Sequence, residues 1–342
     1  MNLPEKPRVA VVGATGAVGR VMLSILAERG FPASEVVAVA SARSAGKQIP
    51  FGDSTLNVCR LSGEIFEGLD LALFDTPDEV AVEWAPRAAK AGAVVVDNSG
   101  GLRMDPEVPL VVPEVNPEAA LSHNGIIASP NCTTIGIAVP LGALHRTFGL
   151  KRVIVSSYQA TSGAGTPGVE ELAQQEPGLR PSLDSPGGVV GDPTVIVPVV
   201  FPAPIHLNVV PVIGSVKHDG FTSEETKMLL ESRKIFKLPE LEVTATCVRV
   251  PTVIGHGASV YAEFEQTVDL KHAYKALDHA DGICLTEVPN PLAAAGTDDC
   301  YVGRLRQDPS HPNSLCFFTV SDNLRKGAAL NAVQIAELLL PG

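Results

Sequence analysis

A glycine-rich turn near the N-terminus constrains the fold of this chain more than any other feature of the sequence. The turn reads Gly13-Ala-Thr-Gly16-Ala-Val-Gly19, follows an apolar run at residues 8–12 and opens a helical pattern over residues 18–29. Glycines in such a turn let the backbone approach a pyrophosphate that sits on the helix N-terminus. The spacing is a variant of the common dinucleotide fingerprint, and its place between a strand and a helix strengthens the interpretation. A glycine-rich turn without a ligand is the alternative.

We therefore predict a Rossmann-type dinucleotide-binding domain at the N-terminus. Strands are expected at residues 8–12, 36–40, 71–74 and 93–96, and helices at 18–29 and 81–91. Strands and helices that alternate in this way build a parallel, doubly wound sheet. The turn residues expected to contact the cofactor are Gly13, Ala14, Thr15, Gly16, Ala17 and Val18.

The pattern changes after Pro130. A helix is expected from Cys132 towards His145, and Pro140 should kink or break it because proline donates no hydrogen bond to the helix. Strands are expected at 152–157, 243–250, 258–265 and 316–320, a glycine-rich turn at 162–165, and helices at 169–174 and 327–340. Residues 177–204 are rich in proline and glycine and are unsuited to regular helix. These signals predict an α/β protein whose second domain is α+β with a mixed sheet.

Composition narrows the possible partners. The formal net charge of -12 disfavours nucleic acid and anionic membrane surfaces. No apolar run is long enough for a membrane-spanning helix, and the polar opening residues do not resemble a signal peptide, so we expect a cytoplasmic protein. The six cysteines are scattered without a C-x-x-C pair, which argues against a disulfide framework and against a bound metal.

The segment after the second expected strand indicates which dinucleotide is bound. It reads Ser41-Ala-Arg43-Ser44-Ala-Gly-Lys47 and contains no carboxylate for a ribose 2′-hydroxyl. Hydroxyl and cationic side chains suit a 2′-phosphate instead, so we expect Ser41, Arg43 and Ser44 to contact NADP. A solvated basic loop is the alternative.

Cys132 is the candidate nucleophile. It lies in Ser129-Pro-Asn131-Cys132-Thr-Thr134, a turn that leads into a helix. A helix N-terminus stabilises a thiolate, so we expect a lowered thiol pKa. Asn131 and nearby backbone N–H groups are candidates to stabilise an oxyanion. A buried structural cysteine is the alternative.

Several motifs in this order resemble the aspartate-semialdehyde dehydrogenase family over nearly the whole chain. They are Val12-Gly-Ala-Thr-Gly16, Ser41-Ala-Arg-Ser44, Asp97-Asn-Ser99 with Arg103, Pro113-Glu-Val-Asn116, Pro130-Asn-Cys132, Tyr158-Gln-Ala160, Gly163-Ala-Gly165, Cys247-Val-Arg249, Gly255-His256 and Ser321-Asp-Asn-Leu-Arg-Lys-Gly327. The resemblance implies that residues 1–131 and 323–342 form the NADP-binding domain and residues 132–322 a catalytic and dimerisation domain.

The same resemblance implies roles for individual residues. Cys132 would be the nucleophile, His256 the acid/base that titrates near neutral pH, and Gln159 the residue that orients the substrate. Arg249 would bind the substrate carboxylate as a rigid, planar fork. A hydrogen-bonding glutamine and a loop histidine without catalytic roles are the alternatives.

Further residues are assigned on the same basis. Glu224 would hold the substrate ammonium, and Lys227 with Arg103 would bind phosphate; a solvated ion pair on a helix is the alternative for Glu224 and Lys227. We also expect cofactor contacts from Ser162, Gly163 and Asn323.

The implied reaction is reduction of L-aspartyl-4-phosphate by NADPH to L-aspartate 4-semialdehyde and phosphate, reversibly, through a Cys132 thioester. This step belongs to lysine, threonine and methionine biosynthesis. The alternatives are a related enzyme such as N-acetyl-glutamyl-phosphate reductase, or an inactive NADP-binding relative. A homodimer or homotetramer is implied, with residues 177–204 as a candidate contact. The chain departs from the family pattern at residues 74–78, Gly100-Gly101, residues 217–219 and Gly257.

Overall fold

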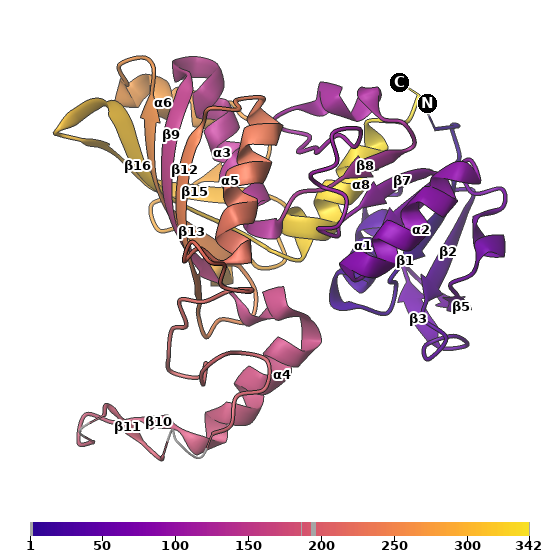
Figure 1. The fold of residues 1–342 in the computed structure, drawn as a ribbon, viewed down its shortest axis with the longest axis horizontal. Coiled ribbons are helices and arrows are strands. Elements are labelled where there is room, and N and C mark those ends of the chain that lie inside the picture. The colour runs from indigo at the N-terminus through magenta and orange to yellow at the C-terminus, as the bar shows by residue number, and fades with distance from the viewer. Residues whose placement is uncertain (1–2, 186, 193–195, 342) are drawn as a thin grey trace.

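Two six-stranded sheets lie side by side and organise the chain (Figure 1). The structure is a computed structural model that describes residues 3–185, 187–192 and 196–341. Within the described residues, no helix is both long enough and apolar enough to span a bilayer. The fold class expected from the sequence, a Rossmann-type sheet followed by an α+β part with a mixed sheet, is confirmed.

The first sheet is entirely parallel, with strand order β5-β2-β1-β6-β7-β8. Its strands are β1 (Arg8–Val12), β2 (Glu35–Ala40), β5 (Cys59–Arg60), β6 (Leu71–Phe74), β7 (Val94–Asp97) and β8 (Ile126–Ala128). The helix α1 (Ala17–Glu28) packs on one face, and α2 (Asp78–Lys90) packs on the other. The four predicted strands and both predicted helices are present, whereas β5, β8 and the hairpin of β3 (Gln48–Phe51) and β4 (Ser54–Asn57) were not predicted.

The second sheet is mixed and has the order β12-β9-β13-β16-β15-β14. Its strands are β9 (Leu150–Gln159), β12 (Glu242–Arg249), β13 (His256–Phe264), β14 (Ile283–Leu285), β15 (Cys300–Asp308) and β16 (His311–Ser321). The helices α3 (Cys132–Phe148), α5 (Ser223–Phe236) and α6 (Leu270–Asp278) cover one face and share its hydrophobic core. The short helix α7 (Pro291–Ala294) precedes β15; α6, α7, β14 and β15 were not predicted.

Pro140 does not break α3, contrary to the expectation from the sequence. The helix runs from Cys132 to Phe148 with Pro140 inside it. A proline leaves the carbonyl four residues earlier without its helical donor. Here that carbonyl is Gly136 O, and the Thr319 hydroxyl of β16 donates to it at 3.2 Å. The neighbouring strand therefore satisfies the group that the proline leaves free.

An arm extends away from both sheets (Figure 1). It begins with a 3-10 turn over Thr161–Ala164, continues through α4 (Gly165–Gln175), and includes a short hairpin of β10 (Arg180–Pro181) and β11 (Val189–Val190). Residues 186 and 193–195 of the expected proline- and glycine-rich stretch lie outside the described residues. Glu171 and Gln175 on α4 are buried and accept backbone hydrogen bonds from residues 199–206, which holds this segment against α4.

The C-terminal segment returns to the first sheet. A π-helical turn over Arg325–Ala329 leads into α8 (Leu330–Glu337), so the helix expected at residues 327–340 is shorter than predicted. Helix α8 shares a hydrophobic cluster with α1 and β1, and Leu3 N donates to Leu339 O at 2.8 Å. The two ends of the chain therefore lie next to each other, and α8 lies between the two sheets (Figure 1).

Candidate active site

Cys132 is the first residue of α3, and Asn131 caps this helix. The Asn131 side-chain oxygen accepts hydrogen bonds from Thr133 N at 2.9 Å and Thr134 N at 3.3 Å. An asparagine before the first helical residue satisfies N–H groups that have no partner within the helix. The Asn131 amide nitrogen donates to Glu224 Oε1 at 2.8 Å. The cap therefore connects the helix of the candidate nucleophile to α5.

Three adjacent strands bring Gln159, Arg249 and His256 together. Gln159 ends β9 and is paired with Arg249, which ends the parallel strand β12. His256 begins β13, on the other side of β9, where Gly257 pairs with Tyr158. All three side chains are buried. Because β9 lies between the other two strands, residues about 90 positions apart in the sequence meet at one edge of the sheet.

Only part of the Arg249 guanidinium has hydrogen-bond acceptors among the described residues. Its Nη1 donates to Ala160 O at 2.7 Å, whereas its buried Nε has no partner among the described residues. Its side chain lies against the Phe201 ring, 5.8 Å from the centroid, and burial lowers its pKa. A buried cation without a carboxylate partner is costly, so its surroundings are suited to a bound anion. The free edge of the fork fits a substrate carboxylate.

His256 is held in one tautomer by the backbone. Ala160 N donates to His256 Nδ1 at 3.0 Å, and a backbone N–H is always a donor. The neutral ring therefore carries its proton on Nε2, which is buried and has no partner within the described part of the chain. Burial, with Arg249 adding to it, lowers the pKa of His256 to about 3. The expectation that it titrates near neutral pH is wrong for this geometry, because the ring is fully enclosed and faces a cation.

The pKa of the Cys132 thiol is also shifted against expectation. Burial raises it to about 11, and the nearby Glu224 carboxylate raises it further. Arg249, Arg103 and a hydrogen bond with Thr133 act in the opposite direction but do not outweigh burial. The predicted lowering by the helix N-terminus is therefore wrong here. The thiol is partly accessible and protonated at neutral pH.

One face of α5 contributes a row of charged residues. Glu224, Lys227 and Glu231 are spaced by three, four and seven positions, which places them on the same face. Glu224 is buried, whereas the Lys227 side chain is 41% exposed, with its ammonium 3.8 Å from Glu224 Oε2. Lys227 is therefore the most exposed of the four substrate-binding candidates.

Glu231 is a site residue that the sequence analysis missed. Its carboxylate accepts from Arg103 Nη1 at 3.0 Å and from Asn131 N at 2.7 Å. Arg103 also donates to Ser129 O at 2.9 Å and Asn98 O at 2.6 Å, so its guanidinium is fixed in place with donors to spare. A second glutamate seven residues after Glu224 was the available signal, because it lies two turns along the same face.

A pocket of about 260 Å³ lies beside the thiol. Its wall includes both expected cofactor contacts and expected catalytic residues: Ala17, Val18, Arg103, Asn131, Cys132, Ser162, Gly163 and Asn323. Glycine is required at Gly163, where a Cβ would lie 2.6 Å from Arg249 Nη1 and 2.9 Å from His256 Nε2. Asn323 connects the turn at Ser162 with the turn that precedes His256. Its side-chain amide nitrogen donates to Ser162 Oγ, and its side-chain oxygen accepts from Gly255 N.

The remaining expected cofactor residues lie in the glycine turn before α1 and in the loop after β2. Gly16 precedes this helix without a side-chain cap, and its first turn carries no acidic residue. Gly13 has a φ of 99°, which allows its turn to fold closely against Asp75. The first N–H groups of α1, which have no acceptor within the helix, fit a pyrophosphate, and the exposed Arg43 after β2 fits a 2′-phosphate. Ser44 is buried, and its hydroxyl lies 3.5 Å from that of Thr15; Ala14 is buried in the turn and Ser41 is exposed.

Three of the departures from the family pattern fit the side chains around them. Asp78 accepts a hydrogen bond from Gly100 N at 2.7 Å, and a Cβ at Gly101 would lie 2.6 Å from Val82. A Cβ at Gly257 would lie 2.8 Å from the Phe318 ring. The small residues therefore make room for Asp78, Val82 and Phe318.

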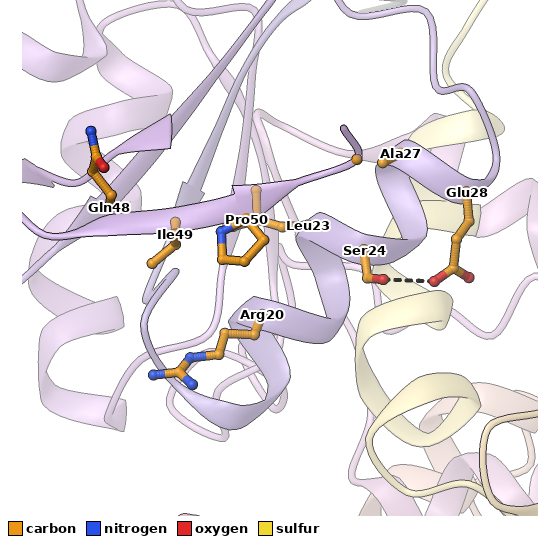
Figure 2. Close-up of a pocket in the computed structure, with 9 residues that line it drawn as sticks. Arg20, Leu23, Ser24, Ala27, Glu28, Gln48, Ile49 and Pro50 are labelled. Atoms are coloured by element: carbon orange, nitrogen blue, oxygen red, sulfur yellow. Dashed lines mark hydrogen bonds between the residues drawn. The ribbon is translucent and has the colours of Figure 1, made fainter. Parts of the chain in front are cut away.

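A larger hollow of about 590 Å³ lies elsewhere, between α1 and β3 (Figure 2). Its charged lining residues are Arg20 and Glu28, and Ser24 donates to Glu28 at 2.6 Å. It shares no residue with the pocket beside Cys132. Within the described residues, no cluster of three or more His, Cys, Asp or Glu side chains is arranged to hold a metal.

Comparison with known families agrees with the two-part architecture. Residues 8–123 match the semialdehyde dehydrogenase NAD-binding domain, and residues 141–326 match the semialdehyde dehydrogenase dimerisation domain. The chain therefore belongs to the semialdehyde dehydrogenase family, whose members are oxidoreductases that act on aldehydes.

The chain is similar over nearly its whole length to aspartate-semialdehyde dehydrogenases. It is 48% identical to that of Mycolicibacterium smegmatis, with 97% of this chain and 98% of the relative covered. It is 44% identical to that of Synechocystis, with 99% and 98% covered. The crystal structure of aspartate semialdehyde dehydrogenase II from Vibrio cholerae, complexed with ASA, matches with a TM-score of 0.90 and 41% identity, covering 98% of each chain. The resemblance stated from the sequence is confirmed.

Proposed function

We propose that the enzyme reduces L-aspartyl-4-phosphate with NADPH to L-aspartate 4-semialdehyde and phosphate, reversibly, through a thioester on Cys132. The observation that carries the proposal is that a buried cation, Arg249, and a buried anion, Glu224, both lie close enough to Cys132 to act on the pKa of its thiol. A zwitterion with a carboxylate and an ammonium complements that pair of charges. The aspartate-semialdehyde dehydrogenase relatives support the same substrate.

Arg249 and Glu224 are proposed to orient the substrate. The free Nε of Arg249 would pair with the α-carboxylate, and the Glu224 oxygen that does not contact Asn131 would accept from the α-ammonium. Gln159 is buried at the end of β9, and its amide donates to Ser157 Oγ at 3.1 Å, which leaves its carbonyl oxygen for the substrate. Two fixed opposite charges would hold the reacting carbon beside the thiol.

Cys132 is proposed to attack the acyl phosphate carbon, forming a C–S bond as the C–O bond to phosphate breaks. The thiol proton passes to the departing phosphate during this attack, since the thiol pKa is about 11. A dinucleotide bound beside Cys132 would supply the hydride that reduces the thioester. His256 Nε2–H then stabilises the developing oxyanion of the hemithioacetal, as a neutral imidazole can when its pKa is lowered. Cleavage of the C–S bond releases the aldehyde and regenerates Cys132.

Phosphate is proposed to bind between Arg103 and Lys227. Arg103 is held rigid by Glu231, Ser129 and Asn98, so it needs little further ordering to meet an anion. Lys227 is half exposed and able to swing towards the same position. We further propose that NADP is preferred over NAD, because Ser41 and Arg43 after β2 are exposed and their loop has no carboxylate.

We also propose a homodimer of cytoplasmic chains, with residues 1–131 and 323–342 as the cofactor-binding domain and 132–322 as the catalytic and dimerisation domain. Exposed apolar residues on the arm support a dimer contact there: Leu183, Val190, Val197, Val199 and Val200. Ile154 and Tyr158 on β9 are further exposed apolar side chains, on the second sheet. A homotetramer would need a second such surface.

The reaction is tested by following NADP reduction with L-aspartate 4-semialdehyde, with and without inorganic phosphate. N-acetylglutamate 5-semialdehyde serves as the rival substrate. We expect phosphate-dependent turnover of the aspartyl aldehyde and little of the N-acetylated one, and Glu224→Gln should raise KM for the former. Equal turnover of the rival, or indifference to Glu224→Gln, would favour a substrate without a free ammonium. No turnover of either with NADP still bound would favour an inactive relative.

A further inference from the structure

The pocket beside Cys132 contains a carboxylate that the proposed chemistry does not use. Asp75 follows β6 directly, and its carbonyl is packed so closely that a Cβ on Gly13 would lie 1.9 Å from it. The side chain of Asp75 lines the same pocket as Cys132 and the first residues of α1, Ala17 and Val18. Its backbone position is therefore fixed by the glycine turn itself.

The Asp75 carboxylate has no hydrogen-bond or ion-pair partner among the described residues. Burial raises its pKa to about 6, and Asp97 adds to the shift, so no nearby cation compensates the charge. Asn98 lines the same pocket, and both polar atoms of its side chain are shielded from solvent without a described partner. Buried polar groups are normally satisfied in native proteins. The buried amide of Asn98 and the half-buried carboxylate of Asp75 line one pocket without a described partner, which indicates a ligand that supplies the partners.

The position of the pocket indicates which part of the ligand lies there. One end is the start of α1, where a dinucleotide pyrophosphate would bind, and the other end is the Cys132 thiol. The part of the cofactor between its pyrophosphate and its reacting carbon is the nicotinamide riboside. In its oxidised form this part carries a positive charge, and in its reduced form it is neutral.

We propose that Asp75 is a specificity-determining residue that faces the nicotinamide riboside and favours the oxidised, cationic cofactor over the reduced one. This inference rests on the proposed NADP-dependent function. A carboxylate near the ring attracts the cation and leaves the neutral form almost unaffected. Asp75 would thereby bias the bound equilibrium towards hydride donation, which is the direction that reduces the acyl group.

The test is to measure the dissociation constants of NADP+ and NADPH separately, by calorimetric titration at pH 8, where the carboxylate is ionised. Asp75→Asn keeps the shape and one acceptor oxygen but removes the charge. Asp75→Ser removes the charge and also shortens the side chain. We expect each variant to weaken NADP+ relative to NADPH by about threefold or more. Asp53→Asn, on the exposed turn between β3 and β4, removes the same charge away from the pocket and should leave the ratio unchanged.

The outcomes separate this inference from the proposed function. If the unaltered enzyme binds neither cofactor, the proposed function fails. If it binds both, and the Asp75 variants change both constants equally or change neither, Asp75 does not discriminate the charge of the ring and the inference is overturned. Equal weakening would indicate a hydrogen bond to the ribose alone.

Discussion

Three charged side chains surround the Cys132 thiol and act on its pKa in opposite directions. Glu224 raises the pKa, whereas Arg249 and Arg103 lower it by attracting the thiolate. Removal from water is the largest influence and leaves the value at about 11. The thiol therefore keeps its proton at neutral pH until it attacks the substrate.

This pKa predicts how the rate of Cys132 alkylation depends on pH. Only the thiolate reacts, so the rate should be low at pH 7 and rise about tenfold per pH unit up to pH 9. Glu224→Gln keeps an acceptor for Asn131 but removes the charge that raises the pKa, so alkylation at pH 8 should accelerate about threefold or more. Iodoacetamide labelling of the Cys132 peptide, followed by mass spectrometry, measures this rate.

The matched control is Glu79→Gln, which removes a charge on the exposed side of α2. It should alkylate like the unaltered enzyme. A rate that is flat between pH 7 and 9, or that falls in Glu224→Gln, would contradict the described environment of the thiol.

Sequence reasoning proposed Cys132 and His256 as catalytic residues but predicted the wrong protonation behaviour for both. The helix N-terminus at Cys132 is visible in the sequence, whereas the burial that outweighs it comes from segments far along the chain. The tautomer of His256 depends on a backbone N–H, that of Ala160, which has no side-chain signature. Local motifs indicate which residues gather, but the electric environment depends on tertiary packing.

Among the secondary-structure elements, α5 connects the most parts of the site. Its Glu224 contacts Asn131, and its Glu231 contacts both Arg103 and the backbone of Asn131. The helix begins with a complete capping box between Thr222 and Glu225, which fixes its first turn. The phosphate-binding candidate and the nucleophile's helix are therefore positioned by the same element.

Removal of the Glu231 carboxylate should destabilise the protein strongly. The Glu231 side chain is 1% exposed and that of Arg103 is 8% exposed, so Glu231→Ala would leave a buried cation without its partner. We expect a loss of about 3–5 kcal/mol in the free energy of unfolding. Urea unfolding measures the change, with Glu240→Ala on the exposed end of the same region as control. A loss below about 1 kcal/mol would show that the pair is not buried as described.

A substitution at Gly163 tests how closely the turn over Thr161–Ala164 approaches the side chains of Arg249 and His256. A Cβ there would displace Arg249 and His256, which it would meet at 2.6 and 2.9 Å. We expect Gly163→Ala to lower kcat/KM by about a hundredfold or more, because small misplacements of reacting groups are costly. Gly63→Ala, where a Cβ meets nothing within 4 Å, is the control. Unchanged kinetics in Gly163→Ala would place this turn further from the site.

The strands were largely predicted from their apolar runs, but their pairing was not. The expected strands at 152–157 and 243–250 correspond to β9 and β12, which lie parallel and end on Gln159 and Arg249. Nothing in either segment indicates that they are neighbours, because the arm and α5 intervene. The uninterrupted α3 was missed for a similar reason, since the Thr319 hydroxyl that compensates Pro140 comes from a distant strand.

In the molecule as a whole, the arm extends away from both sheets and carries highly exposed apolar side chains (Figure 1). Leu183 is 102% exposed, Val199 is 87% exposed and Val197 is 78% exposed. Exposed apolar side chains gathered on one segment indicate a surface that another chain covers. The matching dimerisation domain includes the whole arm.

We expect the double variant Val197→Ser with Val199→Ser to weaken the dimer about tenfold or more, because two apolar side chains would no longer be buried on association. Sedimentation velocity over a range of concentrations measures the dissociation constant. Leu121→Ser, which is 62% exposed on the nucleotide-binding side, is the control and should not change it. An unchanged constant in the double variant would remove the arm from the interface.

The covalent thioester proposed on Cys132 is tested most directly by a single-turnover experiment without phosphate. The enzyme is mixed with NADP and L-aspartate 4-semialdehyde, and NADPH formation and the intact protein mass are followed together. We predict a burst of one NADPH per active site and a mass increase of one aspartyl group, located on Cys132 and released by added phosphate. Cys132→Ala should show neither signal while still binding NADP. Continuous NADPH formation in Cys132→Ala, or an adduct on another cysteine, would contradict the account.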